Sequence, residues 1–182
     1  MKLLVVVDMQ NDFIDGSLGS ETAQAIVPNV VKKIADAKNN HEIIIATQDT
    51  HYSDYLNTLE GKNLPIKHCI ANSDGWQIND LIYNQLNTYD KVKYIAKPTF
   101  GSYALMNYIK ALQEIYDTDK ELIIDIIGLM LNICVISNAI ILKTYFPNAA
   151  INVDISCTAA TSPEAYDSSI SILESCQINV YK

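Results

Sequence analysis

Three residues capable of nucleophilic or acid–base chemistry lie where apolar runs of this sequence end. Asp8 follows residues 3–7, Lys97 follows residues 91–96, and Cys134 comes shortly after Gly128, which closes the run 122–127. A buried ammonium is costly unless a carboxylate or thiolate faces it, so Lys97 needs partners of these types. Taken alone, Cys134 could equally be a buried core cysteine. Asp8 or Lys97 alone could equally cap a helix or belong to a surface ion pair. Their coincidence at strand ends favours a catalytic set.

The residues after Cys134, from Val135 to Leu142, predict a helix that begins close to the thiol. Backbone N–H groups and the dipole at a helix N-terminus stabilise a thiolate and lower the pKa of a cysteine. Free N–H groups there can also hold the oxyanion of a tetrahedral intermediate. The position of Cys134 is therefore suited to a nucleophile, with a buried structural cysteine as the alternative.

A second group of chemically useful residues lies in the long polar stretch 49–79. It contains two of the three histidines, His51 and His68, and Asp49 lies two residues before His51. Imidazole nitrogens and carboxylate oxygens suit zinc, iron or manganese with open water positions. The alternative is a pair of histidines that make only surface or hydrogen-bonding contacts. Connections of this length are uncommon in compact domains and are usually functional or disordered.

Six runs rich in β-branched residues predict the strands that must position these side chains. They are residues 3–7, 42–47, 91–96, 122–127, 150–155 and 178–181. Several are apolar at nearly every position, as expected of parallel strands covered on both faces. Apolar residues at helical spacing follow Pro28 and recur from Leu105 to Ile115, and a helix start is predicted at Ser162.

We therefore expect an α/β fold, a three-layer α/β/α arrangement with a mostly parallel six-stranded sheet, formed by a single domain over residues 1–182. In such a sheet, ligands bind in the crevice beyond the carboxyl ends of the strands. Asp8, Asp49, Lys97 and the segment that leads to Cys134 should converge at that edge.

Composition narrows the classes of function. The chain has 182 residues, 49% of them hydrophobic, and a formal net charge of -8. Because nucleic-acid binding needs clustered Lys and Arg, we expect no nucleic-acid partner. The first apolar run is too short for a signal peptide or a membrane span, which predicts a cytoplasmic protein without a membrane partner. Four cysteines without a CxxC spacing suit reduced thiols.

Three segments resemble the isochorismatase-like cysteine hydrolases, the family that includes nicotinamidases. Residues 5–13 (VVVDMQNDF) are similar to the opening strand and catalytic aspartate, residues 97–103 (KPTFGSY) to the catalytic lysine segment, and residues 128–135 (GLMLNICV) to the nucleophile segment. The resemblance spans nearly the whole chain. It implies a catalytic triad of Asp8, Lys97 and Cys134, in which Cys134 is the nucleophile and forms a thioester.

The resemblance also implies the geometry of the nucleophile segment. A cis peptide bond would join Leu129 to Met130, as occurs mainly where the surrounding structure enforces it. The backbone N–H groups of Met130 and Cys134 would then form the oxyanion hole.

For the metal, the resemblance matches Asp49, His51 and His68 to the ligands of nicotinamidases. It implies a divalent cation, zinc in the first place, with iron or manganese as alternatives. A further ligand of those enzymes has no clear match, and Asn57 and Asp54 are the candidates for its place.

Phe13, Tyr103 and Leu131 are the residues that we expect to line the substrate pocket. Members of the family usually carry Thr and Asp or Glu at the positions of Leu131 and Asn132, and many nicotinamidases carry an aromatic residue at that of Pro65. These departures bear on the identity of the substrate more than on the type of reaction.

The presence of Cys134 implies hydrolysis of an amide or ureide, because the family members that cleave a vinyl ether lack this cysteine. Nicotinamide is the leading candidate, since no cationic cluster accompanies Lys97 to hold a dianionic ligand. An N-carbamoyl compound or another small amide is the alternative, and we also expect a homo-oligomer. A family member that only binds its ligand, or a phosphoacceptor signalling domain, is a remote alternative. A signalling domain would need neither Cys134 nor the histidine-bearing loop.

Overall fold

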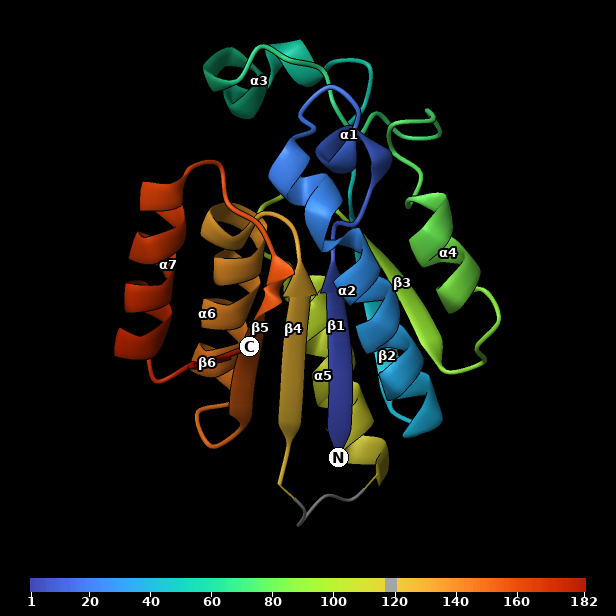
Figure 1. The fold of residues 1–182 in the computed structure, drawn as a ribbon, viewed down its shortest axis with the longest axis vertical. Helices are drawn as coiled ribbons and strands as arrows, with labels where there is room; N and C mark the ends of the chain where they lie inside the picture. Colours follow the sequence, from blue (N-terminus) through green and yellow to red (C-terminus); the bar gives the residue numbers. More distant parts are fainter. Residues whose placement is uncertain (117–120) are drawn as a thin grey trace.

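The computed structural model describes residues 1–116 and 121–182. Its centre is a sheet of six parallel strands, which confirms the predicted fold class. The strands are β1 (Lys2–Val7), β2 (Ile43–Asp49), β3 (Val92–Lys97), β4 (Ile123–Gly128), β5 (Ala150–Thr158) and β6 (Asn179–Tyr181). Their spatial order is β3-β2-β1-β4-β5-β6 (Figure 1). Each of the six predicted runs forms one of these strands.

Helices cover both faces of this sheet, as predicted. One hydrophobic core includes α1 (Asn11–Ile14), α2 (Glu21–Asn39) and α4 (Asp80–Leu86), and the other includes α5 (Tyr103–Tyr116), α6 (Ile136–Tyr145) and α7 (Pro163–Ser175). Strand β1 contributes to both cores, because alternate side chains of a strand point to opposite faces. Within residues 1–116 and 121–182, no helix has both the length and the apolar character needed to cross a membrane.

Helix α2 begins earlier than the apolar spacing after Pro28 indicates. It starts at Glu21, because the hydroxyl of Ser20 accepts a hydrogen bond from the N–H of Ala23 and so caps the first turn. Buried apolar residues occur on both sides of Pro28, which therefore lies inside the helix. The start of α7 after Ser162 agrees with the prediction.

The carboxyl ends of the strands carry the residues that the sequence analysis selected. Asp8 follows β1, while Asp49 and Lys97 end β2 and β3 and are register partners. Gly128 ends β4 and pairs with Val7 at the end of β1. The strand order reverses between β1 and β4, and open α/β sheets bind their ligands at such a switch point.

The segment between β2 and α4 covers this edge of the sheet (Figure 1). It contains the 3-10 turn η1 (Tyr55–Asn57) and the short helix α3 (Leu59–Asn63). Both are too short to produce the periodicity that predicts longer helices. Isolated bridges pair His51 with Ile70 and Gln10 with Ile78, so the segment is tied to the ends of β1 and β2.

Gly128→Ala should strongly destabilise the protein. Gly128 has a φ of +112°, which side-chain-bearing residues rarely adopt, and an added Cβ would collide with the backbone oxygen of Val7. Because β1 cannot move without disrupting its ladder, we expect the free energy of unfolding in urea to fall by about 3 kcal/mol or more. Gly101→Ala is the control, since its Cβ would meet mainly the movable tip of Ile141. Equal losses in the two variants would contradict this explanation.

Candidate active site

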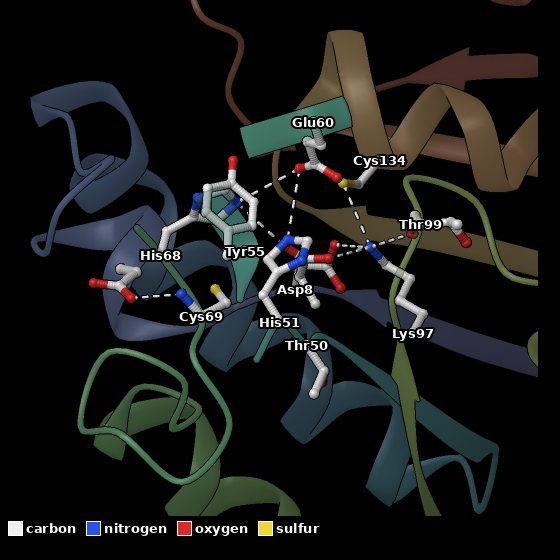
Figure 2. A network of polar contacts seen from close by, with 12 residues as sticks. Asp8, Thr50, His51, Tyr55, Glu60, His68, Cys69, Lys97, Thr99 and Cys134 are labelled. Atoms are coloured by element: carbon white, nitrogen blue, oxygen red, sulfur yellow. Dashed lines mark hydrogen bonds and ion pairs between the residues drawn. The ribbon is translucent and has the colours of Figure 1, made fainter. Parts of the chain in front are cut away.

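The ammonium group of Lys97 lies at the centre of a buried polar cluster (Figure 2). Its Nζ is 2.7 Å from Asp8 Oδ2 and 3.5 Å from Cys134 Sγ, and it donates a hydrogen bond to the carbonyl of Thr99 at 3.1 Å. The other carboxylate oxygen of Asp8 accepts from the hydroxyl of Thr47 at 2.7 Å. The structure thus brings Asp8, Lys97 and Cys134 together from the end of β3 and from the segments that follow β1 and β4.

Burial determines the charges in this cluster, because Asp8, Lys97 and Cys134 are only 0%, 1% and 6% exposed. Burial raises the pKa of Asp8 above its ordinary value, although the charge of Lys97 opposes the rise. Burial alone would lower the pKa of Lys97, but the surrounding negative groups, Asp8 foremost, raise it. Lys97 is therefore a stable cation, and Asp8 is a stronger base than an exposed aspartate.

The pKa of Cys134 is raised, whereas its place near a helix start led us to expect a lowered value. Burial is the main cause, and the negative charge of Asp8 adds to it, while Lys97 acts in the opposite direction. The thiol therefore keeps its proton at rest. A neighbouring base must remove that proton before the sulfur can act as a nucleophile.

Cys134 lies in a wide π-helical turn, η2 (Leu131–Val135), which leads into α6. The peptide bond between Leu129 and Met130 is cis, in agreement with the resemblance. In the part of the chain that the structure describes, no backbone carbonyl accepts a hydrogen bond from the N–H of Met130. This N–H is thus free to act as one donor of the predicted oxyanion hole.

Asn132 braces this turn from outside. Its Nδ2 donates to Thr161 Oγ1 at 2.9 Å, and its Oδ1 accepts from the N–H of Thr161 at 3.1 Å. Thr161 lies in the wall of the cavity in front of Cys134. The residue that departs from the family pattern therefore still supports the turn, through a pair of neutral hydrogen bonds.

Asp49, His51 and His68 form a second buried cluster beside the first. Asp49 Oδ2 lies 3.0 Å from His51 Nε2 and 3.5 Å from His68 Nε2. Ligands bound tetrahedrally at about 2.0 Å from a zinc ion are about 3.3 Å from one another, which is close to these separations. The donor atoms are thus placed to hold one divalent cation.

The hydrogen bonds of the two histidines also suit a cation. His68 Nδ1 lies 2.9 Å from the carbonyl oxygen of Ile66, so the neutral ring carries its proton there and leaves the Nε2 lone pair facing Asp49. Among the described residues, His51 Nε2 has no hydrogen-bond partner of good geometry, although it is buried. Such a nitrogen calls for an explanation, and a metal ion satisfies it.

Glu60 adds a fourth possible donor, which the sequence analysis missed. Its Oε1 lies 3.5 Å from His51 Nε2 and 3.8 Å from His68 Nε2. Asp54 and Asn57, the candidates from the sequence, are exposed. Glu60 belongs to the short helix α3, whose placement over the sheet edge depends on tertiary contacts. An acidic residue in a histidine-bearing loop was the only signal that could have pointed to it.

Asp49 connects the two clusters. Its Oδ2 faces the histidines, and its Oδ1 lies 3.6 Å from Lys97 Nζ. Burial would raise the pKa of Asp49, but the closeness of His51 and His68 and the charge of Lys97 bring it well below its ordinary value. The buried amide of Gln10 donates to the Asp49 carbonyl at 2.8 Å and accepts from its N–H at 2.7 Å. Asp49 is therefore held as a carboxylate in a defined position.

A cavity of about 410 Å³ opens beside Cys134. Phe13 lines it, as predicted, together with Phe100 and Leu64. The second cluster reaches the cavity through Asp49, His68 and Glu60. A larger cavity of about 510 Å³ lies at the opposite end of the sheet, but its lining includes neither a thiol nor the histidine pair. The chemistry therefore favours the smaller cavity as the substrate site.

Two residues predicted for the pocket lie elsewhere. Tyr103 is 73% exposed at the start of α5, and Leu131 is fully buried in the core shared with α5, α6 and α7. Neither lines the cavity. Side-chain direction explains both differences, because Phe100 faces the cavity before the chain turns into α5, and Ile133 does so within η2.

Comparisons with known proteins agree with this arrangement. The nicotinamidase of Saccharomyces cerevisiae is 27% identical over an alignment 218 residues long, which spans 99% of each chain. The crystal structure of a pyrazinamidase of Pyrococcus horikoshii in complex with zinc has a TM-score of 0.80 at 20% identity, over 100% of this chain and 98% of that one. An N-carbamoylsarcosine amidase from Thermoplasma acidophilum has a TM-score of 0.77 at 24% identity, over 100% and 95% of the two chains.

The family assignment comes from a match over almost the entire chain. The model of the isochorismatase domain matches residues 2–181, a span that contains every residue of both clusters. The protein therefore belongs to the isochorismatase family.

Proposed function

We propose that this protein hydrolyses a small amide with Cys134 as the nucleophile, through a thioester intermediate. The observation that carries the proposal is a thiol at the wall of a cavity, 3.5 Å from a buried ammonium that is paired with the carboxylate of Asp8. These are the nucleophile, the base and the cation that amide cleavage of this type requires. The three relatives described above are all named as amidases.

In the proposed reaction, Asp8 accepts the thiol proton and the sulfur attacks the amide carbon. When the C–N bond breaks, Asp8 gives this proton to the leaving nitrogen, and the acyl group remains on Cys134 as a thioester. Asp8 next takes a proton from water, the resulting hydroxide attacks the thioester carbon, and the proton returns to the departing sulfur. The raised pKa of Asp8 suits a group that must both accept and release a proton.

Lys97 and the backbone of η2 have supporting roles in this scheme. Lys97 stays charged throughout and keeps Asp8 within reach of the sulfur. The N–H groups of Met130 and Cys134 are proposed to bind the oxyanion, because preorganised donors stabilise charge that develops in a transition state.

We propose that Asp49, His51, His68 and Glu60 hold a divalent cation, zinc or alternatively iron or manganese. When bound, the cation supplies a Lewis acid that polarises a ring nitrogen of the substrate or orders the hydrolytic water. Three of the four residues also line the cavity, so the cluster faces the substrate site.

Nicotinamide is the substrate that we propose, and the chain's cations support a neutral ligand. The sequence contains no arginine, and Lys97 is already paired with Asp8, so the cavity has no guanidinium to bind a carboxylate in a bidentate manner. Phe13 and Phe100 provide aromatic surface for a flat ring. The alternative is an N-carbamoyl compound, as the name of the Thermoplasma acidophilum relative indicates for that protein.

We further propose that the protein is cytoplasmic and forms a homo-oligomer, with neither nucleic acid nor a membrane as a partner. The net charge of -8 supports the first of these exclusions, because an acidic protein repels the phosphate backbone.

In a Cys176→Ser background, iodoacetamide should modify Cys134 before the other thiols. Cys176 is exposed and would react as an ordinary surface thiol, whereas Cys69 and Cys157 are 0% and 2% exposed and do not line the cavity. Intact-mass spectrometry and peptide mapping would identify the site. Cys134→Ala should lose at least about a thousandfold in turnover without a change in melting temperature. First labelling at Cys69 or Cys157, or full activity of Cys134→Ala, would refute the assignment.

Glu60→Gln should weaken zinc binding about tenfold or more, because it removes one charged donor of the proposed site. Chelator-treated protein would be titrated with zinc by calorimetry. Asp54→Asn is the matched control, since it removes the same charge from an exposed position of the same loop. An unchanged affinity in Glu60→Gln would exclude Glu60 as a ligand, and no zinc binding by the wild type would exclude the whole site.

Ammonia release should be fastest from nicotinamide, slower from propionamide and slowest from N-carbamoylsarcosine. Stacking and burial of an aromatic ring contribute about 2 to 3 kcal/mol, so we expect kcat/KM for nicotinamide to exceed that for propionamide about a hundredfold. The carboxylate of N-carbamoylsarcosine would meet no arginine. Turnover of the carbamoyl compound without turnover of nicotinamide would reject nicotinamide and retain the cysteine amidohydrolase.

A further inference from the structure

Asn138 is a fully buried residue of α6 whose side chain makes three hydrogen bonds. Its Nδ2 donates to the carbonyl of Cys134 at 2.8 Å and to the carbonyl of Phe100 at 3.2 Å, and its Oδ1 accepts from the N–H of Ser102 at 2.9 Å. The bond to Cys134 joins α6 to the preceding turn η2, and these two elements together are called the nucleophile helix below. The other two bonds reach a loop 36 and 38 residues away in sequence. One planar amide therefore joins the backbone of the nucleophile to residues 98–102.

The loop formed by residues 98–102 carries one wall of the substrate cavity. Phe100 lines the cavity, and the loop's other end is held by Lys97, whose ammonium donates to the carbonyl of Thr99. The hydroxyl of Thr99 in turn donates to the carbonyl of Gly101. Gly101 packs so closely against α6 that an added Cβ would contact Ile141. The loop thus spans the gap between the catalytic lysine and the nucleophile helix.

Phe100 is 49% exposed, so the packing of its own ring does not restrain it fully. Its backbone carbonyl accepts a hydrogen bond from Asn138, and the N–H of Ser102 donates one to the same side chain. The hydroxyl of Ser102 accepts from the N–H of Leu105, where α5 begins. The position of the aromatic wall relative to the sulfur therefore depends on Asn138 more than on contacts made by Phe100 itself.

We propose that Asn138 is a positioning residue that sets the distance between Phe100 and Cys134 and so determines the affinity of the site for flat aromatic amides. The inference rests on the proposed amidohydrolase function and adds a specificity determinant to it. Asn138 acts through Phe100 and does not itself line the cavity. Its effect should therefore appear in the binding of aromatic substrates before it appears in the chemical steps.

The test is a double-mutant cycle between Asn138→Leu and Phe100→Ala. Leucine has a similar volume but leaves two carbonyls and one N–H without their partner, so KM for nicotinamide should rise about tenfold while kcat falls less than about threefold. With Phe100→Ala already present, Asn138→Leu should raise KM less than about twofold. KM for propionamide should change little in any of the variants.

Thr144→Val is the control, because Thr144 makes a side-chain hydrogen bond to Ile140 on the same helix, and no hydrogen bond among the described residues joins its side chain to the loop. It should leave KM and kcat as in the wild type. Melting by circular dichroism would show whether each variant folds. If Asn138→Leu does not fold, Asn138→Asp replaces it, since it keeps the acceptor for Ser102 and removes the amino group. An equal rise of KM in both Phe100 backgrounds, or a fall of kcat as large as the rise of KM, would overturn the proposal.

Binding can be measured without turnover, which separates this inference from the proposed function. In the Cys176→Ser background, benzamide should protect Cys134 from iodoacetamide, and Asn138→Leu should raise the half-protecting concentration about tenfold only when Phe100 is present. If no amide is hydrolysed but this pattern holds, the proposed function fails and the role of Asn138 stands. The absence of protection by benzamide, or an increase independent of Phe100, would refute the role of Asn138.

Discussion

The ammonium of Lys97 is 1% exposed and lies within 4 Å of Asp8, Asp49 and Cys134, and the rest of the site is arranged around it. A cation in this environment is tolerated only with negative partners in good geometry, and removal of one partner from a buried pair costs about 3 to 5 kcal/mol. The same low exposure raises the pKa of the Cys134 thiol and of Asp8. Lys97 therefore offsets the cost of burying the carboxylate of Asp8 beside the thiol of Cys134, an arrangement that the proposed chemistry needs.

Asp49 extends this constraint to the second cluster, which it forms with His51 and His68. One of its oxygens faces Lys97 and the other faces His51 and His68, while its backbone is clamped by Gln10, which directly follows the turn after β1. The two clusters consequently share a carboxylate whose position is set by two neighbouring strands. A shift of β2 relative to β1 would disturb the ion pair with Lys97 and the spacing of the metal donors together.

Much of this site could be predicted from the sequence because its main residues lie at strand ends. The apolar runs before Asp8 and Lys97 identify parallel strands, and parallel strands end at one edge, so the convergence of these residues follows from the pattern. Glu60 and Phe100 could not be found in this way, since they lie on a short helix and a loop that have no periodicity of their own. The raised pKa of Cys134 was likewise beyond the pattern, because a helix start indicates a favourable dipole but says nothing of burial beside Asp8.

The sequence by itself determined the strands and the longer helices in their order, the residues that end the strands and the resemblance to a family, because these depend on local periodicity and on residue types at short spacing. The tertiary structure decided which side chains face the cavity. Tyr103 and Leu131 lie close in sequence to Lys97 and Cys134, yet one is exposed and the other is buried in the core. The direction of a side chain in a loop or a π-helical turn depends on contacts with distant segments, and that information is absent from spacing along the chain.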